Sequence, residues 1–309
     1  MKFTSKLAAA LALTCMLSGC GGSGNTIATL NSDYTITADK AYEDLMKTSD
    51  GKNAVFNYIV EEIISANYPV TDAMTTDADL KVQQLENSYT SYYGADASTY
   101  LNQALQQNGY ENLDAFRKSI ILGYQMREFL NDYINQNMDT LFEDYYNTCS
   151  PRYVSHILVL MNDSNNPTAE ELEKVDTIKK ALADGQDFAS VARTYSDDST
   201  ASKGGALGLC DKNTSFVPEF LAKMMELKEG EVSEPTKTDY GYHIITVTST
   251  SKEEIKQDDS LVSLIEQYDQ NLYYKALRNY EITFNDETIK ELYESTLDSY
   301  LKTSEGSAQ

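Results

Sequence analysis

Apolar side chains recur at helical spacing through most of the first half of the chain. Val55, Ile59 and Ile63 follow one another at intervals of four residues, which places them on one face of an α-helix. Thr37 is a suitable N-cap for the first helix of this region. Further amphipathic helices are predicted over 77–93, 98–107 and 112–146, the last with an interruption near 135–138. Residues 37–147 are therefore predicted to form a helical domain.

The pattern changes after Pro151, where short strands alternate with helices. Strands are predicted over 152–160 and 242–248, and helices over 167–183 and 187–195. Gly204, Gly205 and Gly208 interrupt the periodicity between the second helix and the last strand. This stretch is predicted to be a compact α+β module of roughly a hundred residues.

Two apolar helical stripes follow the module. They consist of Leu261, Leu264, Ile265, Tyr268 and Leu272, and of Ile289, Leu292, Tyr293, Leu297 and Tyr300. Such stripes are too apolar for free helices in water, so we expect at least one to pack back on the N-terminal helices. The predicted fold class is α+β, with the module inserted in a discontinuous, mostly α-helical domain. The expected boundaries are 27–150 for the first helical part, 151–250 for the module and 251–309 for the C-terminal helices.

The first nineteen residues have the pattern of a secretory signal peptide. Two lysines precede an uncharged apolar run over 7–17, which is too short to span a bilayer as a stable helix. The run ends in Leu17-Ser18-Gly19-Cys20, which resembles a bacterial lipobox. Residues 1–19 are then expected to be removed, Cys20 to be lipidated and residues 20–26 to form a flexible tether. A lipid anchor on the outer face of the bacterial cytoplasmic membrane follows; an ordinary cleaved signal with a chance cysteine is the alternative.

Composition narrows the range of partners. The chain has 309 residues, of which 41% are hydrophobic and 24% charged, which suits two domains with sizeable cores. Its 48 acidic residues outnumber 25 basic ones, for a net charge of −23. Because such a surface repels phosphate backbones, nucleic acid is not expected as a partner. Cys149 and Cys210 are the cysteines of the predicted folded body, and either a disulfide or two isolated buried thiols fits the sequence.

Both histidines of the chain, His156 and His243, lie in the α+β module, on its outer predicted strands. A lone histidine in a strand is usually structural, so the surrounding residues decide the interpretation. They match the elements of one family in chain order. Its opening strand corresponds to Ser155–Val159, its second helix and the exit from it to Phe188, Ala189, Val191, Ala192, Tyr195, Ser196 and Asp197, and its glycine turn to Gly204, Gly205, Leu207 and Gly208. Its aromatic position corresponds to Phe220, its final approach to Gly230–Ser233 and Thr238, and its closing strand to Gly241–Ile245. Residues 152–247 thus resemble the parvulin family of peptidyl-prolyl isomerases.

This resemblance implies a set of site residues. His156, Asp198, Thr238 and His243 correspond to the catalytic polar core of parvulins, and Leu207, Phe216 and Phe220 are candidates for the apolar slot that binds the proline ring. No metal and no cofactor is implied, and the histidines and cysteines lack the short ligand spacing of a metal site. The histidine pair has a second interpretation, a buried network that holds two strands together, which is compatible with catalysis.

The sequence departs from the family pattern near the glycine turn and in one loop. Parvulins usually have an acid between Gly205 and Leu207 and aromatics after Gly208, where this chain has Ala206, Leu209 and Cys210. The loop over 161–173 carries four acidic residues and no lysine or arginine. It therefore lacks the basic clamp of phosphoserine-directed parvulins, and ordinary X-Pro segments are the expected substrates.

The segment before the helices resembles a second family feature. Residues 27–39, a predicted strand and turn that lead into a helix, look like the start of the chaperone domain of PrsA-type and SurA-type foldases. The whole chain is therefore expected to isomerise X-Pro bonds in unfolded exported proteins and to act as a chaperone. The alternative is a non-catalytic holdase that uses the parvulin module as a scaffold. A homodimer is compatible with both.

Overall fold

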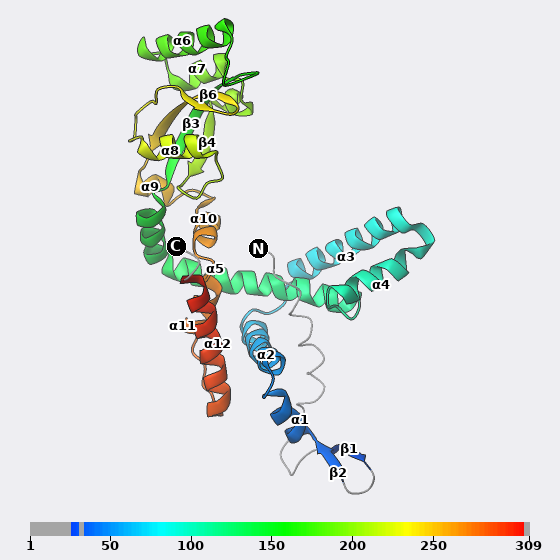
Figure 1. Ribbon diagram of the computed structural model, residues 1–309. Coiled ribbons are helices and arrows are strands. Elements are labelled where there is room, and N and C mark those ends of the chain that lie inside the picture. Colours follow the sequence, from blue (N-terminus) through cyan, green and yellow to red (C-terminus); the bar gives the residue numbers. More distant parts are fainter. Residues whose placement is uncertain (1–25, 31–33, 306–309) are drawn as a thin grey trace. The chain divides into compact units, whose positions relative to one another are not determined.

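The computed structural model describes residues 26–30 and 34–305, and Figure 1 shows the order of their elements. Contacts divide the chain into two compact units. We call residues 137–270 the sheet unit, and the described residues among 1–136 and 271–309 the helical unit. The expected signal peptide, the lipidation site Cys20 and residues 21–25 of the expected tether lie outside the described residues, whereas Thr26, the last residue of that tether, is the first residue of a strand. Within them, no helix is long and apolar enough to cross a membrane.

The sheet unit contains an antiparallel four-stranded sheet with the order β4-β3-β6-β5. Its strands are β3 (Arg152–Leu160), β4 (Ala206–Cys210), β5 (Thr236–Thr238) and β6 (Gly241–Ser249). Its helices are α6 (Ala169–Ala183), α7 (Phe188–Tyr195), the 3-10 helix η3 (Ser199–Lys203), α8 (Pro218–Glu226), α9 (Lys252–Ile255) and α10 (Leu261–Tyr268), together with the end of α5 (Leu113–Cys149). The predicted α+β class and the small antiparallel sheet with surrounding helices are confirmed.

Alternating side chains give the two faces of this sheet different neighbours. On one face, Ile157, Val159 and Ile244 pack in a cluster with buried residues of α6 and α7. On the other face, Val154 and Ile245 pack with buried residues of α8. Since His156 alternates with Ile157 and is two residues from Val154, its side chain belongs to the face covered by α8.

Local signals position the covering helices. Thr168 and Glu171 form a capping box at the start of α6, and Asp187 caps α7 by accepting the Ser190 N–H at 2.9 Å. Pro218 stands in the first turn of α8, where a missing N–H removes no helical hydrogen bond. At the other end of α8, the buried Arg152 guanidinium donates to the carbonyls of Met224 and Leu227, both at 3.0 Å. These contacts fix α8 against β3.

The helical unit contains a strand pair and long helices. Its elements are β1 (Thr26–Leu30), β2 (Tyr34–Thr37), α1 (Ala38–Leu45), α2 (Ser49–Asn67), α3 (Asp72–Tyr93), the 3-10 helix η2 (Gly94–Asp96), α4 (Ala97–Gln107), the first part of α5, α11 (Leu272–Asn279) and α12 (Glu287–Glu305). β1 and β2 are antiparallel, and Thr37 caps α1 as predicted. One core cluster joins Phe56 of α2, Phe129 of α5, and Tyr293 and Leu297 of α12. The second C-terminal stripe therefore packs on the N-terminal helices.

Three features differ from the sequence-based expectations or complete them. The predicted interruption near 135–138 is wrong, because α5 is continuous and Ile134, Phe142 and Tyr145 stay buried at helical spacing. The histidine strands are the central pair of the sheet, not its outer strands, since chain order does not set strand order. Cys149 and Cys210 are both free and buried.

The compact units begin and end at other residues than the expected domains. The sheet unit takes in the end of α5 as well as α9 and α10, where Leu261 and Ile265 are buried. Packing therefore groups the first C-terminal stripe, as far as Tyr268, with the sheet, whereas its last residue, Leu272, and the second stripe belong to the helical unit. The domain boundaries at residues 150 and 250 stay a prediction.

Candidate active site

The two histidines are brought together by the register of β3 and β6. His156 lies opposite Ile245, and His243 lies opposite Leu158, so the histidines are diagonal neighbours on one face. Their rings are nearly parallel, with centroids 5.5 Å apart and an interplanar angle of 14°. The two Nδ1 atoms are 3.2 Å apart, which is within hydrogen-bond distance. Both side chains are buried.

Polar groups extend this pair at both ends. The Oγ1 atom of Thr238 lies 3.0 Å from Nε2 of His243, and it accepts the Tyr240 N–H at 3.2 Å. At the other end, Nε2 of His156 lies 3.3 Å from Oδ1 of Asp198, although its direction does not meet the geometry of a hydrogen bond. Thr238, His243, His156 and Asp198 thus form a continuous polar row, which we call the histidine row.

The Asp198 carboxylate determines the direction of the protons along this row. A negative oxygen beside Nε2 of His156 favours a proton on that nitrogen, so Nδ1 of His156 must accept. Nδ1–H of His243 then donates to it, and Nε2 of His243 accepts the Thr238 hydroxyl proton. The opposite direction would point a ring lone pair at the carboxylate. One set of neutral tautomers therefore satisfies the contact between the two Nδ1 atoms and the contact of His243 with Thr238, and it leaves Nε2–H of His156 beside the carboxylate.

Burial keeps both imidazoles neutral. It lowers the pKa of His243 to about 4, an effect to which the neighbouring His156 adds. Burial also lowers the pKa of His156, against the opposing influence of Asp198. Burial alone would raise the pKa of Asp198, but hydrogen bonds from Thr200 and the approach of His156 outweigh it and hold that pKa below its usual value. At neutral pH the row consists of two neutral rings and one carboxylate.

Asp198 is positioned by its own chain segment. Its Oδ1 caps η3 by accepting the Thr200 N–H at 2.8 Å and the Thr200 hydroxyl at 2.5 Å. The preceding residues are tied to β3, because the Asp197 N–H donates to the Leu158 carbonyl at 2.8 Å. The Asp198 side chain is 27% exposed, whereas that of His156 is 7% exposed. Asp198 is therefore the member of the histidine row with an acidic group open to solvent.

Aromatic and aliphatic groups lie beside the row. The Phe220 ring stands edge-on to both imidazoles, with centroids 5.5 Å from His156 and 5.2 Å from His243. The ring centroids of Phe216 and Phe220 are 4.7 Å apart, and Leu207 is a partly buried member of the same cluster. The three apolar candidates from the sequence are thus grouped next to the polar ones.

The structure adds one residue that sequence reasoning missed. Met224 is fully buried in the cluster of Phe220 and follows it by one helical turn on α8. That spacing was the signal that could have revealed it. Of the three departures from the parvulin pattern, Cys210 is buried in this cluster, Leu209 is half-buried and Ala206 is exposed.

Comparisons with known proteins show which proteins this chain is similar to. Residues 156–249 match the rotamase family described as the PPIC-type PPIASE domain. The foldase protein PrsA of Geobacillus sp. is 34% identical over 262 residues, which cover 84% of each chain. PrsA of Geobacillus kaustophilus is 33% identical over 248 residues, 80% of this chain and 79% of that one. A crystal structure of the peptidylprolyl isomerase PrsA from Bacillus cereus has 26% identity and a TM-score of 0.39, and the match covers 89% of this chain and 99% of that chain.

The family match begins at His156, within β3, and contains all of β6 and the helix that carries Phe220. The similarity to the two Geobacillus foldases extends well beyond it into the flanking helices. The chain therefore belongs to the family of PrsA foldases and is a parvulin-type peptidyl-prolyl isomerase.

Proposed function

We propose that this chain is a lipid-anchored extracytoplasmic foldase that isomerises X-Pro bonds in unfolded exported proteins and also binds those proteins as a chaperone. The observation that carries the proposal is the histidine row beside the buried Phe220, with Asp198 as its solvent-exposed end. His156 has the carboxylate at one side and the Phe220 ring at another, and we infer that a prolyl bond in rotation uses both of these groups.

Rotation of a peptide bond needs no covalent step. The barrier is about 18–20 kcal/mol, and uncatalysed X-Pro exchange takes tens of seconds or longer. A catalyst must therefore bind the twisted amide better than either planar form. In our proposal Phe220, Phe216 and Leu207 hold the proline ring, which leaves the preceding carbonyl free to turn. Met224 is proposed to support Phe220 within the same buried cluster.

Asp198 is proposed to act on the carbonyl oxygen. In the planar amide, resonance places partial negative charge on this oxygen, and a twisted amide loses that resonance. A nearby carboxylate destabilises the charge-separated form and so favours twisting. The lowered pKa of Asp198 keeps it ionised at neutral pH, as this role requires. Its exposure is large enough for a substrate to reach it.

The histidines and Thr238 are proposed to position these groups. They are almost inaccessible to solvent, with exposures of 4% to 6%, so little of their surface is available to a substrate. Their directed hydrogen bonds fix the ring planes against which Phe220 packs. The row thereby keeps both the apolar slot and the carboxylate in place.

The charge of the acidic loop favours unphosphorylated substrates. Residues 161–173 include Asp163, Glu170, Glu171 and Glu173 and no basic residue. Glu171 is occupied by the capping box of α6 and by the Asn162 N–H at 3.0 Å. A phosphate group before the proline would meet repulsion there, so neutral or basic residues before proline are the proposed preference.

Lipid anchoring is supported by the lipobox-like sequence that ends at Cys20. Growth with a labelled fatty acid tests it directly. Wild-type protein should carry the label and sediment with membranes, whereas Cys20→Ala should carry none. A labelled Cys20→Ala variant would place the lipid elsewhere, and an unlabelled wild type would leave the ordinary signal peptide as the explanation.

The holdase alternative is favoured by Ala206, Leu209 and Cys210, which replace the usual acid and aromatics at the glycine turn. Refolding of a client limited by X-Pro isomerisation separates the two functions. We expect wild type to accelerate the slow phase, and Phe220→Ala and His243→Ala to lose that acceleration while they still suppress aggregation. If folded wild type suppresses aggregation without any effect on the slow phase, the chain is a holdase and the catalytic proposal fails.

A further inference from the structure

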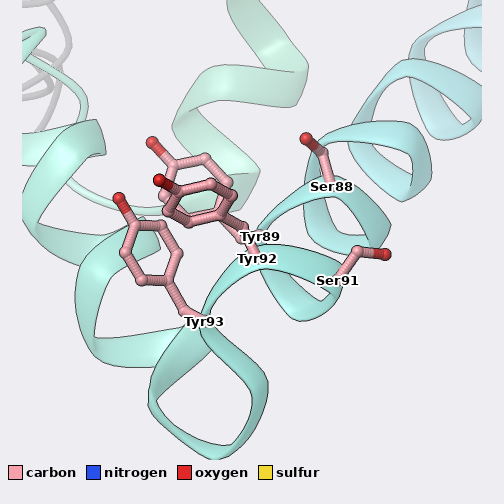
Figure 2. Close-up of a pocket in the computed structure, with 5 residues that line it drawn as sticks. All are labelled: Ser88, Tyr89, Ser91, Tyr92 and Tyr93. Atoms are coloured by element: carbon pink, nitrogen blue, oxygen red, sulfur yellow. The ribbon is translucent and has the colours of Figure 1, made fainter.

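Tyrosines cluster where α3 turns into α4, in the helical unit. Figure 2 shows the rings of Tyr89, Tyr92 and Tyr93 gathered on the same side of the end of α3. Tyr93 stacks on Tyr89 with centroids 5.6 Å apart, and on Tyr100 of α4 at 4.3 Å. Tyr92 meets Tyr93 edge-on at 4.8 Å. We call these four residues the tyrosine patch.

The patch is open to solvent. Tyr92 is 82% exposed, Tyr100 45% and Tyr93 38%. A shallow cavity of about 480 Å³ is lined by Tyr89, Tyr92 and Tyr93 together with Ser88 and Ser91. Large aromatic side chains seldom gather on a surface without a partner, because each exposed ring forgoes the free energy of burial. The patch therefore has the form of a binding surface.

The chemistry of the surrounding sequence indicates the kind of partner. Asp96 is the single charged residue over 87–110, although 24% of the whole chain is charged. The stretch consists largely of tyrosine, serine, asparagine, glutamine and small residues. Antibody paratopes use a similar composition, because tyrosine gives rigid contact area and small polar side chains give adaptable hydrogen bonds. Without a lysine or arginine, this stretch offers nothing to bind phosphate or anionic lipid headgroups.

We propose that the tyrosine patch is a second polypeptide-binding site, which binds uncharged, extended, proline-containing segments of unfolded chains. The proposal rests on the proposed function, since it assumes that the clients of the isomerase are also the ligands of the patch. A proline-rich segment in the polyproline II conformation has no internal hydrogen bonds and is already extended. Its rings pack on aromatic side chains, and its free carbonyls accept hydrogen bonds from hydroxyl groups such as those of Tyr92 and Ser91.

The experiment uses the full chain and one probe. The probe is a capped, uncharged Ala-Pro repeat peptide that carries a photo-crosslinking group and a fluorophore. Crosslinks are mapped by mass spectrometry, and affinity is measured by fluorescence anisotropy. Phe220→Ala impairs the isomerase site, and the double variant Tyr92→Ala/Tyr100→Ala removes the two most exposed rings of the patch. Leu80→Ala, at a 49% exposed residue of the same helix, is the matched control.

We expect crosslinks within 88–100 in both wild type and Phe220→Ala. The double tyrosine variant should lose those crosslinks, and its affinity measured in the Phe220→Ala background should fall about tenfold or more. Leu80→Ala should keep the affinity, and Tyr92→Phe should keep most of it because the ring remains. Isomerisation of a short X-Pro peptide should be unchanged in the double tyrosine variant.

Two results would overturn the proposal and leave the isomerase intact. In one, all crosslinks fall within 152–249 and disappear in Phe220→Ala. In the other, a soluble N-acetylglucosamine oligosaccharide binds the patch while the peptide does not, which would make it a glycan site. Conversely, crosslinks at the patch from a wild type that fails to accelerate X-Pro exchange would support the patch and refute the proposed catalysis.

Discussion

Gly205 occupies the closest approach between the glycine turn and the histidine row. Its φ is +78°, and a Cβ atom there would lie 2.1 Å from the carbonyl oxygen of His156. Its own carbonyl accepts the His156 N–H at 2.9 Å. Glycine is therefore required for two reasons, the left-handed backbone conformation and the lack of space for a Cβ atom. Any side chain here would displace β3 at His156, a member of the histidine row.

Gly208 provides a matched control, because its φ is +84° but a Cβ there would meet nothing within 4 Å. We predict that Gly208→Ala lowers the free energy of unfolding by about 1 kcal/mol, the strain of a left-handed alanine. Gly205→Ala should lower it by more than about 3 kcal/mol, since the backbone clash adds to the same strain. Urea unfolding followed by circular dichroism compares them, and equal losses would contradict the account.

Single residues were accessible from the sequence to different degrees. His156 and His243 were easy to find because the chain has no other histidine. Their pairing depends on the offset of β3 against β6, which no local pattern encodes. Met224 was missed because a buried methionine on a helix resembles any core residue until Phe220 is placed beside it.

α8 is the element that carries the apolar slot, and its C-terminal end depends on Arg152. The guanidinium donates to the carbonyls of Met224, Leu227 and, through Nε at 3.1 Å, Ser150. The last carbonyls of a helix lack partners within the helix, and a cation there also complements the helix dipole. Arg152 therefore links the start of β3 to the end of the helix that holds Phe220.

We predict that Arg152→Met lowers the free energy of unfolding by about 2–3 kcal/mol, because the buried carbonyls lose charged donors. Isomerase activity should fall with it, even under conditions in which the variant is fully folded, since Phe220 loses its support. Arg152→Lys keeps a positive charge but has no forked donor group, so its stability should be intermediate. Unfolding curves and peptide exchange rates measure both effects; full stability in Arg152→Met would refute this role for the guanidinium.

Elements were easier to predict than their arrangement. Periodicity located the strands that became β3 and β6, and the helices that became α6 and α7, because each has a regular apolar face. It could not give strand order, and it placed the histidines on outer strands that are in fact central. The predicted break in α5 covers the polar residues Asn135, Gln136 and Asn137, but the flanking apolar residues hold the helix continuous.

The stabilities of the two units should change with pH in opposite directions. Burial, with a smaller contribution from the charge of Glu62, raises the pKa of Glu61 in the helical unit to about 7. A raised carboxyl pKa gives stability that is present at low pH and is lost as pH rises through 7. The lowered pKa of His243 in the sheet unit, about 4, gives stability that is present above pH 6.5 and is lost as pH falls toward 4.

We predict that a change from pH 7 to pH 5 stabilises the helical unit and destabilises the sheet unit, the latter by about 2 kcal/mol. Native-state hydrogen exchange with mass spectrometry resolves the two, when rates are corrected for intrinsic exchange. Amides of α2 and α12 should become more protected, and amides of β3 and β6 less protected. Glu61→Gln should remove the first effect alone. A change of the same sign in both units would contradict the pKa assignments.

Domain organisation was only partly accessible from the sequence. Composition and the change of pattern at Pro151 indicated a module within a helical body, which fits the confirmed fold class. The grouping of α10 with the sheet unit could not be predicted. Its apolar stripe, with Leu261 and Ile265, indicates a buried helix but does not indicate which part of the chain covers it.

The central claim is that the histidine row and the slot of Phe220 accelerate X-Pro rotation. Exchange NMR on a short uncharged X-Pro peptide, with a catalytic amount of the chain at pH 7, tests it most directly. Uncatalysed exchange takes tens of seconds, so cross-peaks at mixing times below about one second require catalysis. We predict such cross-peaks with wild type and their loss with Phe220→Ala. Their absence with folded wild type, or their persistence in Phe220→Ala, would contradict the account.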